Sequence, residues 1–361
     1  MKKIKISKEL QNKLFTCGIV VVFFLIMQIL LMTGNLSSLM QGLLVPLCMY
    51  AILAISLNLT VGILGELSLG HAGFMCVGAF TSALFSKYMM IVEPNFNSGL
   101  RFFLALIIGT AFAGLFGILI GIPVLRLKGD YLAIVTLAFG EIIKNLMNIL
   151  YIGYDKSGFH FSANSSMDVE MDETGEFLIK GPQGITGTPN DSSFVIGIVL
   201  LIITLIIIIN MVQSRTGRAI MAIRDNTIAA ESVGINVTKY KLLAFAVSAA
   251  MAGTAGVLYA HNLSTLTALP KNFGYNMSIM ILVFVVLGGI GSIRGSMIAA
   301  VILTLLPEWL RELQDYRMLI YAIVLILMML FNWAPKCIEW REKMTAKVKI
   351  KFNKFTKKEG I

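Results

Sequence analysis

Cysteine and histidine are scarce in this 361-residue chain. Three of the four cysteines, Cys17, Cys48 and Cys76, lie in apolar stretches and the fourth, Cys337, lies near the C-terminus, so they lack the spacing of a disulfide framework. The three histidines are scattered and have no metal-ligand spacing. These scarcities exclude a small disulfide-stabilised protein and predict that the chain binds no metal.

Motifs of nucleotide-binding and hydrolytic enzymes are missing. The phosphate loop Gly-x4-Gly-Lys-Ser/Thr does not occur, so any ATP must be bound by another chain. Glu66, Ser68 and His71 offer the side chains of a serine hydrolase, but the sequence Glu-Leu-Ser-Leu-Gly is not a Gly-x-Ser-x-Gly elbow. We therefore predict no catalytic residues, and an intramembrane enzyme is disfavoured.

Charged residues make up only 14% of the chain, whereas 57% of it is hydrophobic and the mean hydropathy is +0.81. This composition excludes a soluble globular protein. Apolar runs of about 17–23 residues recur, as a bilayer requires, because backbone polar groups inside it must be satisfied within the helix. We predict an all-α polytopic membrane protein with about ten transmembrane helices in a compact bundle. The predicted spans are approximately 15–33, 42–64, 68–86, 102–125, 131–152, 193–212, 242–260, 277–292, 295–311 and 317–333.

The first apolar run, FTCGIVVVFFLIMQILLM, follows several lysines, as a signal peptide would. It is too long for the apolar region of a signal peptide, and no small-residue cleavage site follows it. We therefore expect a retained helix.

Lysine and arginine number 30 against 20 acidic residues, which gives a net charge of +10. Basic residues near membrane helices collect on the cytosolic side. With ten spans, residues 1–13, 213–241 and 334–361 fall on one side together with three basic residues of short loops, so this side holds 22 basic residues and the other 7. This split predicts that both termini are cytosolic and argues against a nucleic-acid partner. The C-terminal tail is expected to lie along anionic lipid headgroups.

The predicted organisation is a basic cytosolic N-terminus (1–14), a transmembrane domain (15–333) and a basic cytosolic tail (334–361). Loop 213–241 is predicted on the cytosolic side and loop 153–192, with seven acidic residues and two lysines, on the external side. Within the external loop, GEFLIKGPQGITG predicts a short strand followed by glycine-containing turns. The loop is either a solvated acidic connection or a docking surface for an external partner.

Small residues are dense in two spans, GTAFAGLFGILIG and SAAMAGTAGVLYA, which favours close helix packing in lipid. A weak internal echo links ELSLGHAGFMCVGAF, beginning at Glu66, with VVLGGIGSIRGSMIAAVIL, beginning at Val285, since both interrupt an apolar stretch with serine and closely spaced glycines. Either these are interrupted helices of the kind that expose backbone groups to a substrate, or they are ordinary glycine-rich packing.

Polar residues inside predicted spans need a partner or a path. Glu141 and Lys144 are three residues apart, close enough for an ion pair on one helix face. Asp130 is predicted to cap the same helix. The stretch GILGELSLGHAGF suggests either a helix break, with Glu66 and His71 facing a cavity, or a plain cytosolic turn. The candidate translocation-path residues are Asn58, Glu66, Ser68 and His71.

The stretch from Gly217 to Ile235 interrupts two uncharged spans with charged residues. Asp225, Asn226 and Thr227 are good N-cap residues, and the following IAAESV continues as one or two helical turns. Gly234 is placed to end these turns in a left-handed conformation. A helix this short is marginal alone, so the bundle or a partner must hold it.

Five segments, taken together and in order, resemble the membrane subunits of ABC importers, and within them the branched-chain amino acid permeases of the LivM type. The segments are GELSLGHAGFMCVGAFTSAL, LRLKGDYLAIVTLAFGEIIKN, GPQGITGTP, SRTGRAIMAIRDNTIAAESVGINVTKYKLLAFAVSAAMAGTAGVLYA and VVLGGIGSIRGSMIAAVIL. The resemblance covers most of the chain and implies that the cytosolic segment is a coupling helix lying in a groove on an ATPase subunit. The residues expected to make that contact are Arg224, Asp225, Ala229, Ala230, Glu231 and Gly234.

The segment departs from the pattern of many importers, in which Glu-Ala-Ala is followed after three residues by Gly and later by Leu-Pro. Ala229, Ala230 and Gly234 keep this spacing, but Ile228 stands where the first acid would be. Glu231 follows the alanines, and alanine follows Leu243 where proline would stand. Contacts are therefore not transferred from other importer families.

The resemblance implies a subunit of an ATP-driven importer that moves leucine, isoleucine and valine inward by alternating access. Its expected partners are two cytosolic ATPase subunits, which bind ATP and magnesium, a related second permease, an extracytoplasmic solute-binding protein and membrane lipid. No cofactor is expected on this chain. The alternatives are an importer of urea, amides or another small solute, and an ion-coupled secondary transporter, for which Glu66 and Glu141 are the candidate acids.

Overall fold

The computed structural model describes residues 8–34, 37–127, 129–165, 169, 171, 175–310 and 316–333. The contacts divide the chain into two units, Met1–Val301 and Ile302–Ile361. The predicted basic tail lies outside the described residues, as does the first half of the predicted N-terminal segment. The expectations for these segments stay predictions.

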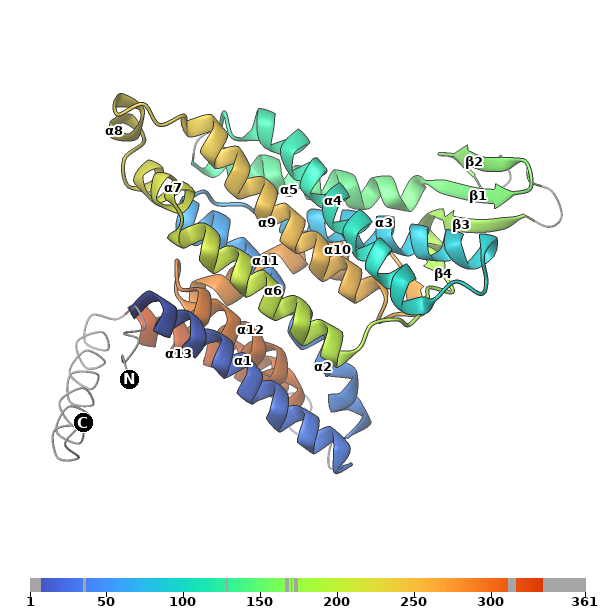
Figure 1. Cartoon of the computed structure of the whole chain (residues 1–361), viewed down its shortest axis with the longest axis horizontal. Helices are drawn as coiled ribbons and strands as arrows, with labels where there is room; N and C mark the ends of the chain where they lie inside the picture. Colours follow the sequence, from blue (N-terminus) through green and yellow to red (C-terminus); the bar gives the residue numbers. More distant parts are fainter. Residues whose placement is uncertain are drawn as a thin grey trace, which may run out of the picture. The chain divides into compact units, whose positions relative to one another are not determined.

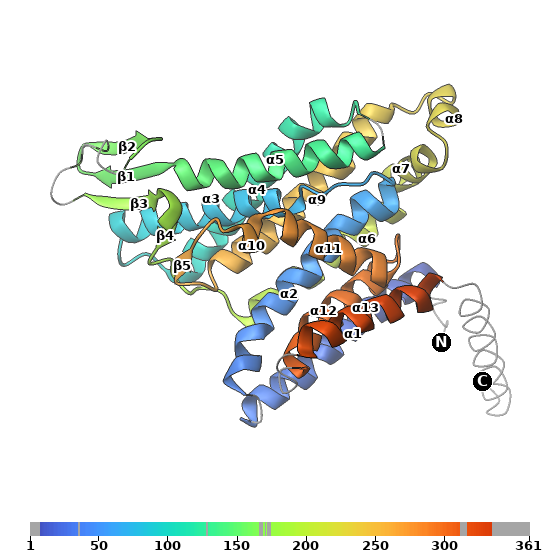
Figure 2. The same ribbon diagram turned by 180° about the vertical axis from the view of Figure 1, so that it is seen from behind.

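Helices make up most of the described chain (Figures 1 and 2). The long helices are α1 (Lys8–Met32), α2 (Ser38–Asn58), α3 (His71–Val92), α4 (Ser98–Val124), α5 (Asp130–Ile149), α6 (Phe194–Gln213), α9 (Val237–Ala260), α11 (Tyr275–Gly288), α12 (Ile293–Trp309) and α13 (Arg317–Trp333). The short helices are the π-helix η1 (Leu59–Leu64), the 3-10 helix η3 (Gly181–Gln183), α7 (Arg215–Asp225), α8 (Thr227–Ser232) and α10 (Pro270–Phe273).

A helix lies at each of the ten predicted spans. Among the described residues, seven helical segments are long and apolar enough to cross a membrane. They are Ser38–Leu64, His71–Val92, Ser98–Val124, Asp130–Ile149, Phe194–Gln213, Val237–Ala260 and Pro270–Gly288. Three further apolar helical segments are shorter than these seven. They are α12 and α13, with 17 residues each, and the apolar part of α1. The structure thus has seven candidate spans among the described residues, and ten spans stays a prediction.

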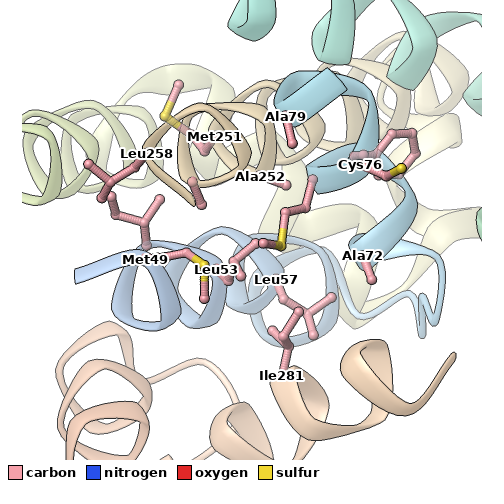
Figure 3. Close-up of a cluster of buried hydrophobic side chains, with 14 of the residues drawn as sticks. Met49, Leu53, Leu57, Ala72, Cys76, Ala79, Met251, Ala252, Leu258 and Ile281 are labelled. Atoms are coloured by element: carbon pink, nitrogen blue, oxygen red, sulfur yellow. The ribbon is translucent and has the colours of Figure 1, made fainter. Parts of the chain in front are cut away.

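The core of the first unit surrounds α2, whose side chains are buried almost continuously from residue 47 onward. A helix that is apolar all round belongs at the centre of a bundle, because no face of it favours water. Figure 3 shows α2 side chains facing α3, α9 and α11. The labelled residues are Met49, Leu53, Leu57, Ala72, Cys76, Ala79, Met251, Ala252, Leu258 and Ile281. By contrast, α4 exposes an apolar face that includes Phe103 and Leu119, as a lipid-facing helix would.

Glycine and alanine bring α3 and α4 into close contact with α9. A Cβ built on Gly78 would collide with the backbone of Gly253, and one on Gly117 would lie 2.5 Å from the Cβ of Ala249. These positions belong to the small-residue stretches singled out in the sequence. The expected close packing is confirmed, and substitution by larger residues would separate the helices.

The connection between α5 and α6 forms strands, so the all-α description is incomplete. A three-stranded antiparallel sheet has the order β2-β1-β3, with β1 at Tyr151–Asp155, β2 at Gly158–Ser162 and β3 at Glu176–Lys180. A second pair joins β4 (Ile185–Thr186) to β5 (Thr265–Leu266). The predicted strand in GEFLIK is confirmed as β3, whereas β1 and β2 were missed.

Helix α5 also differs from the prediction at both ends. It ends at Ile149 rather than continuing to residue 152, because Tyr151 already pairs with β2 and β3. At its start Gly129, with φ +61°, occupies the N-cap position and Asp130 is the first helical residue. The predicted cap by Asp130 is therefore wrong by one position, although a carboxylate in the first turn still favours the helix dipole.

Polar contacts fix the sheet end of the bundle. Arg101, at the start of α4, forms a buried bidentate pair with Asp191, with Nη2 2.8 Å from Oδ2. Lys87 of α3 donates to the carbonyl of Phe177 in β3, and Asn148 of α5 donates to the carbonyl of Ala268. The loop between α5 and α6 is therefore attached to α3 and α4, and the connection between α9 and α10 is attached to α5.

Candidate functional site

The stretch after α2 is non-helical between Leu64 and His71, and we call this gap the first break; both sequence interpretations, a helix break beside a cavity and a cytosolic turn, allow it and stay predictions. The π-helix η1 ends at Gly65, which has φ +82°, and regular helix resumes only at His71. A left-handed backbone conformation at this position favours glycine, because glycine has no Cβ to clash with the backbone. The amides of Gly65 and Glu66 both donate to the carbonyl of Thr60, which closes the π turn.

A second break separates α11 from α12. Helix α11 ends at Gly288, and Gly289 and Gly291 have φ +96° and +83° before α12 begins at Ile293. A left-handed glycine thus precedes the first segment of the weak sequence echo, and two lie within the second. Whether these gaps expose backbone groups to a substrate or only serve glycine-rich packing stays open.

The two breaks contact each other through Asn58, the last residue of α2. Its Oδ1 accepts from the amide of Gly291 at 2.9 Å, and its Nδ2 donates to Oγ of Ser296 in α12 at 3.2 Å. Asn58 is fully buried, so these two bonds replace the hydrogen bonds that its side chain would make with water in the unfolded chain. Gly62 makes the approach possible, since a Cβ there would lie 2.7 Å from the Cα of Gly291.

The other candidate translocation-path residues have separate partners. Glu66 forms an ion pair with Lys241 of α9, and the side chains are 16% and 12% exposed. His71 Nε2 lies 2.7 Å from Oγ of Ser56, and both residues are buried. Oγ of Ser68 is buried and has no hydrogen-bond partner among the described residues. The structure does not gather Asn58, Glu66, Ser68 and His71 into one cluster, and their role in translocation stays a prediction.

The polar segment after α6 forms two helices, of which the sequence predicted the second. Asn226 caps α8, with its Oδ1 accepting from the amide of Ala229 at 3.0 Å, and Gly234 is left-handed with φ +84°. The short helix, its N-cap and its terminating glycine are thus confirmed. Helix α7 was missed, although the spacing of buried Ile220 and Ile223 beside exposed arginines is the periodicity of a surface helix.

The structure divides the predicted coupling residues by the direction that they face. Ala229, Glu231 and Gly234 are exposed, whereas Ala230 is buried against the rest of the chain. Ile228 and Val233, which the sequence reasoning did not select, are 80% and 75% exposed. The sequence signal for these two residues was the presence of large apolar side chains within an otherwise polar segment.

Arg224 and Asp225, at the end of α7, form an ion pair with Nη2 2.9 Å from Oδ1. Nη1 of Arg224 also donates to the carbonyl of Gly62 at 3.2 Å, so the side chain reaches η1. The apolar face of α7 also contacts η1. Its Ile220 packs in a buried cluster with Leu59, Ile63 and Leu64 of η1. Helix α7 therefore lies directly on the first break.

The predicted ion pair of Glu141 and Lys144 is confirmed. The other carboxylate oxygen of Glu141 accepts from the amide of Tyr275 at 2.8 Å, at the start of α11. A carboxylate at a helix N-terminus satisfies an amide that has no partner within the helix. This pair thus attaches α5 to α11.

A family profile described as "branched-chain amino acid transport system / permease component" matches residues 39–331. The chain belongs to this family. The permease is 35% identical over 302 residues to the high-affinity branched-chain amino acid transport system permease protein LivM of Salmonella typhimurium, covering 80% of this chain and 67% of that protein. It is equally identical, over 296 residues, to LivM of Escherichia coli, with the same coverage.

More distant relatives extend the comparison. The permease is 26% identical over 259 residues to the permease protein LivH of Salmonella typhimurium, covering 70% of this chain and 79% of that protein. It is 26% identical over 291 residues to the ribose import permease protein RbsC of Escherichia coli, covering 78% and 81%. No solved structure matches the permease. Family and fold together establish a multi-pass membrane protein that serves as a transport subunit.

Proposed function

We propose that the permease is the membrane subunit of an ATP-driven importer of branched-chain amino acids and that α8 is its contact with an ATPase. The observation that carries this proposal is the exposure of Ile228 in α8, a helix of six residues, and of Val233 directly after it. Asn226 caps the start of the helix and the left-handed Gly234 follows its end, so residues of this chain define both of its ends.

An apolar partner surface explains α8 better than lipid does. The helix lies beside Arg224, Asp225 and Glu231, which are exposed, and charged side chains favour water over hydrocarbon. Two branched apolar side chains exposed to water favour contact with another protein. A protein groove that covers them would also stabilise a helix too short to persist by itself.

The two ends of the first unit suit partners on opposite sides of a membrane. Helices α7 and α8 lie at one end, and the sheet β1–β3 lies at the other (Figure 1). With both termini cytosolic and ten spans within residues 15–333, loop 213–241 meets one of two cytosolic ATPase subunits, which bind ATP and magnesium. Loop 153–192 then faces an extracytoplasmic solute-binding protein, and the basic tail 334–361 faces lipid headgroups.

The substrate class follows from the relatives, since LivM is named as a permease of branched-chain amino acids. A related second permease completes the pore, as the naming of both LivM and LivH as permeases of such a system suggests. An ion-coupled transporter is less well supported, because Glu66 and Glu141 are both paired with lysines. An acid that exchanges a proton with an ion gradient would need to lose such a partner.

Co-purification tests the contact. The substitution Ile228→Asp places a charge at the centre of the proposed interface, so we expect ATPase subunits to be lost from the detergent-purified complex by about tenfold or more. Leu269→Asp is the matched control, because Leu269 is also exposed but lies beyond the other end of α9. Equal retention in both variants would contradict the assignment of α8.

A second test concerns the end of α8. Nothing lies within 4 Å of a Cβ at Gly234, so a substitution there is limited by its left-handed backbone and not by crowding. Gly234→Leu should uncouple transport from ATP hydrolysis while the protein stays in the membrane, because a branched side chain disfavours this conformation by about 1–2 kcal/mol. Gly234→Asn, which tolerates it, should retain most uptake. Undiminished ATP-driven uptake by the leucine variant would refute the assignment.

Substrate choice is tested by uptake into proteoliposomes that contain the complete complex with its solute-binding protein. We expect leucine, isoleucine and valine to accumulate when ATP is supplied, and urea and short amides to accumulate little. The reverse order would retain the import mechanism and replace its substrate. Accumulation driven by an ion gradient without ATP would favour the secondary transporter instead.

A further inference from the structure

The partly exposed side chain of Arg224 contacts η1 as well as its neighbour Asp225. Its guanidinium donates to the carbonyl of Gly62, within η1, at 3.2 Å. Its aliphatic part lies against Gly65, where a Cβ would be 2.6 Å from Cγ of Arg224. The last turn of α7 is therefore bound both to the π-helix and to the glycine that ends it.

Gly62 is also the point where the first break meets the second. A Cβ at Gly62 would lie 2.7 Å from the Cα of Gly291, and Asn58, one turn earlier, accepts from the amide of Gly291. Arg224 and Gly291 thus contact the same residue. A displacement of Arg224 can therefore act on both breaks through a single residue, Gly62.

Helices α7 and α8 are suited to move together. Only Asn226 separates them, and it is bonded on both sides: its amide donates to the carbonyl of Ala222 in α7, and its Oδ1 accepts from Ala229 in α8. Thr227 adds a bond from its hydroxyl to the carbonyl of Ile223. A force applied to the exposed face of α8 is therefore passed to α7 without a flexible connection.

The π-helix is the segment most able to respond. A π turn is rare, occurs mostly as a single turn within or beside an α-helix and is frequent at functional sites. In η1 the turn is held from outside by Arg224 on Gly62 and by the ion pair of Glu66 with Lys241. A segment whose conformation depends on outside contacts changes when those contacts change.

We propose that Arg224 is a positioning residue that transmits the displacement of α7 and α8 to both helix breaks through Gly62 and Gly65. This inference rests on the proposed function, because the displacement originates in an ATPase subunit bound to α8. It assigns Arg224 an intramolecular contact in place of the expected contact with the ATPase.

Hydrogen exchange in the reconstituted complex tests the transmission. In the wild-type complex, a non-hydrolysable ATP analogue should change the exchange of amides in residues 59–70. In Arg224→Ala this response should be lost and the substrate moved per ATP should fall about tenfold, within the usual range of coupling between sites. The ATPase subunits should remain bound, because Ile228 and Val233 are unchanged.

Arg218→Ala is the matched control. Arg218 lies on the same helix and carries the same charge, but it is exposed and its guanidinium donates to the nearby carbonyl of Gln213. We expect its nucleotide response and its uptake per ATP to equal those of the wild type. If Arg224→Ala does not accumulate in membranes, Arg224→Lys replaces it, since one ammonium group cannot reproduce the bonds to both Gly62 and Asp225.

The outcomes separate the two proposals. A substituted Arg224 that keeps the wild-type response and uptake overturns the transmission through Arg224 while ATPase retention still supports the proposed function. A wild-type complex that holds its ATPase but shows no nucleotide response in residues 59–70 also overturns the transmission. A wild-type permease that retains no ATPase contradicts the proposed function itself.

Discussion

The two helix breaks share a glycine-based geometry but differ in what surrounds them. The first, after η1, is held by Arg224 from the polar segment and by the ion pair of Glu66 with Lys241. The second, after α11, is joined to the first by the uncharged side chain of Asn58. The comparison indicates that charged side chains from other segments bond the first break, whereas Arg294, the charge beside the second break, donates to Thr16 of α1. Geometry alone would make the two breaks equivalent, and their neighbours make them different.

The largest effect is expected where the breaks meet. Gly62→Ala places a Cβ against Asn58 and Gly291, so the two breaks must separate. We expect a loss of about 3 kcal/mol or more of stability and little remaining uptake, measured by thermal unfolding in detergent and by transport in proteoliposomes. Gly42→Ala is the control, because it lies on α2 with nothing within 4 Å of the new Cβ. Equal behaviour of the two variants would show that the breaks do not need their close contact.

A smaller effect is expected when the hydrogen-bonded contact of Asn58 with Gly291 is replaced by an apolar one. Asn58→Leu has a similar size but leaves the amide of Gly291 without its acceptor. We expect a stability loss of about 1–3 kcal/mol, because a buried donor loses its partner, with a partial loss of uptake. Thr60→Val provides the control, since its hydroxyl bonds only one turn back, to the carbonyl of Leu57. A stable and active leucine variant would mean that packing alone joins the breaks.

The smallest effect is expected from the charge beside the first break. Glu66→Gln removes the ion pair with Lys241, whose side chains are partly exposed, so we expect a loss of about 1 kcal/mol or less that shrinks further in high salt. Glu93→Gln, at an exposed position beyond α3, should change nothing. The measurement is the unfolding temperature of both variants at low and high salt. A loss larger than that of Asn58→Leu would reverse the order of the comparison.

The sequence predicted the helices well because each apolar run must form its hydrogen bonds internally in lipid. The position of a helix at all ten expected places follows from that requirement. The capped helix α8 and the left-handed Gly234 were also predictable, since a cap acts within one turn. The confirmed pair of Glu141 and Lys144 belongs to the same local kind.

The sequence was less informative wherever partners lie far apart in the chain. The strands β1 and β2 have only five residues each, and β1 begins within the predicted span that ran to residue 152. The N-cap of α5 shifted by one residue, within the normal imprecision of helix ends. The direction of Arg224 depends on a residue 162 positions earlier, which no periodicity within α7 reports.

Composition, periodicity and capping residues alone determined that this chain crosses a membrane in helices, where those helices lie and that a short capped helix interrupts them. These properties depend on contacts within a few residues and on the absence of water in lipid. Only the tertiary structure decided that Asn58 bonds Gly291, 233 residues later, that Glu66 is paired with Lys241 and that Arg224 bonds the carbonyl of Gly62. Those contacts form between helices, and side chains reach their partners only once the bundle has brought the helices together.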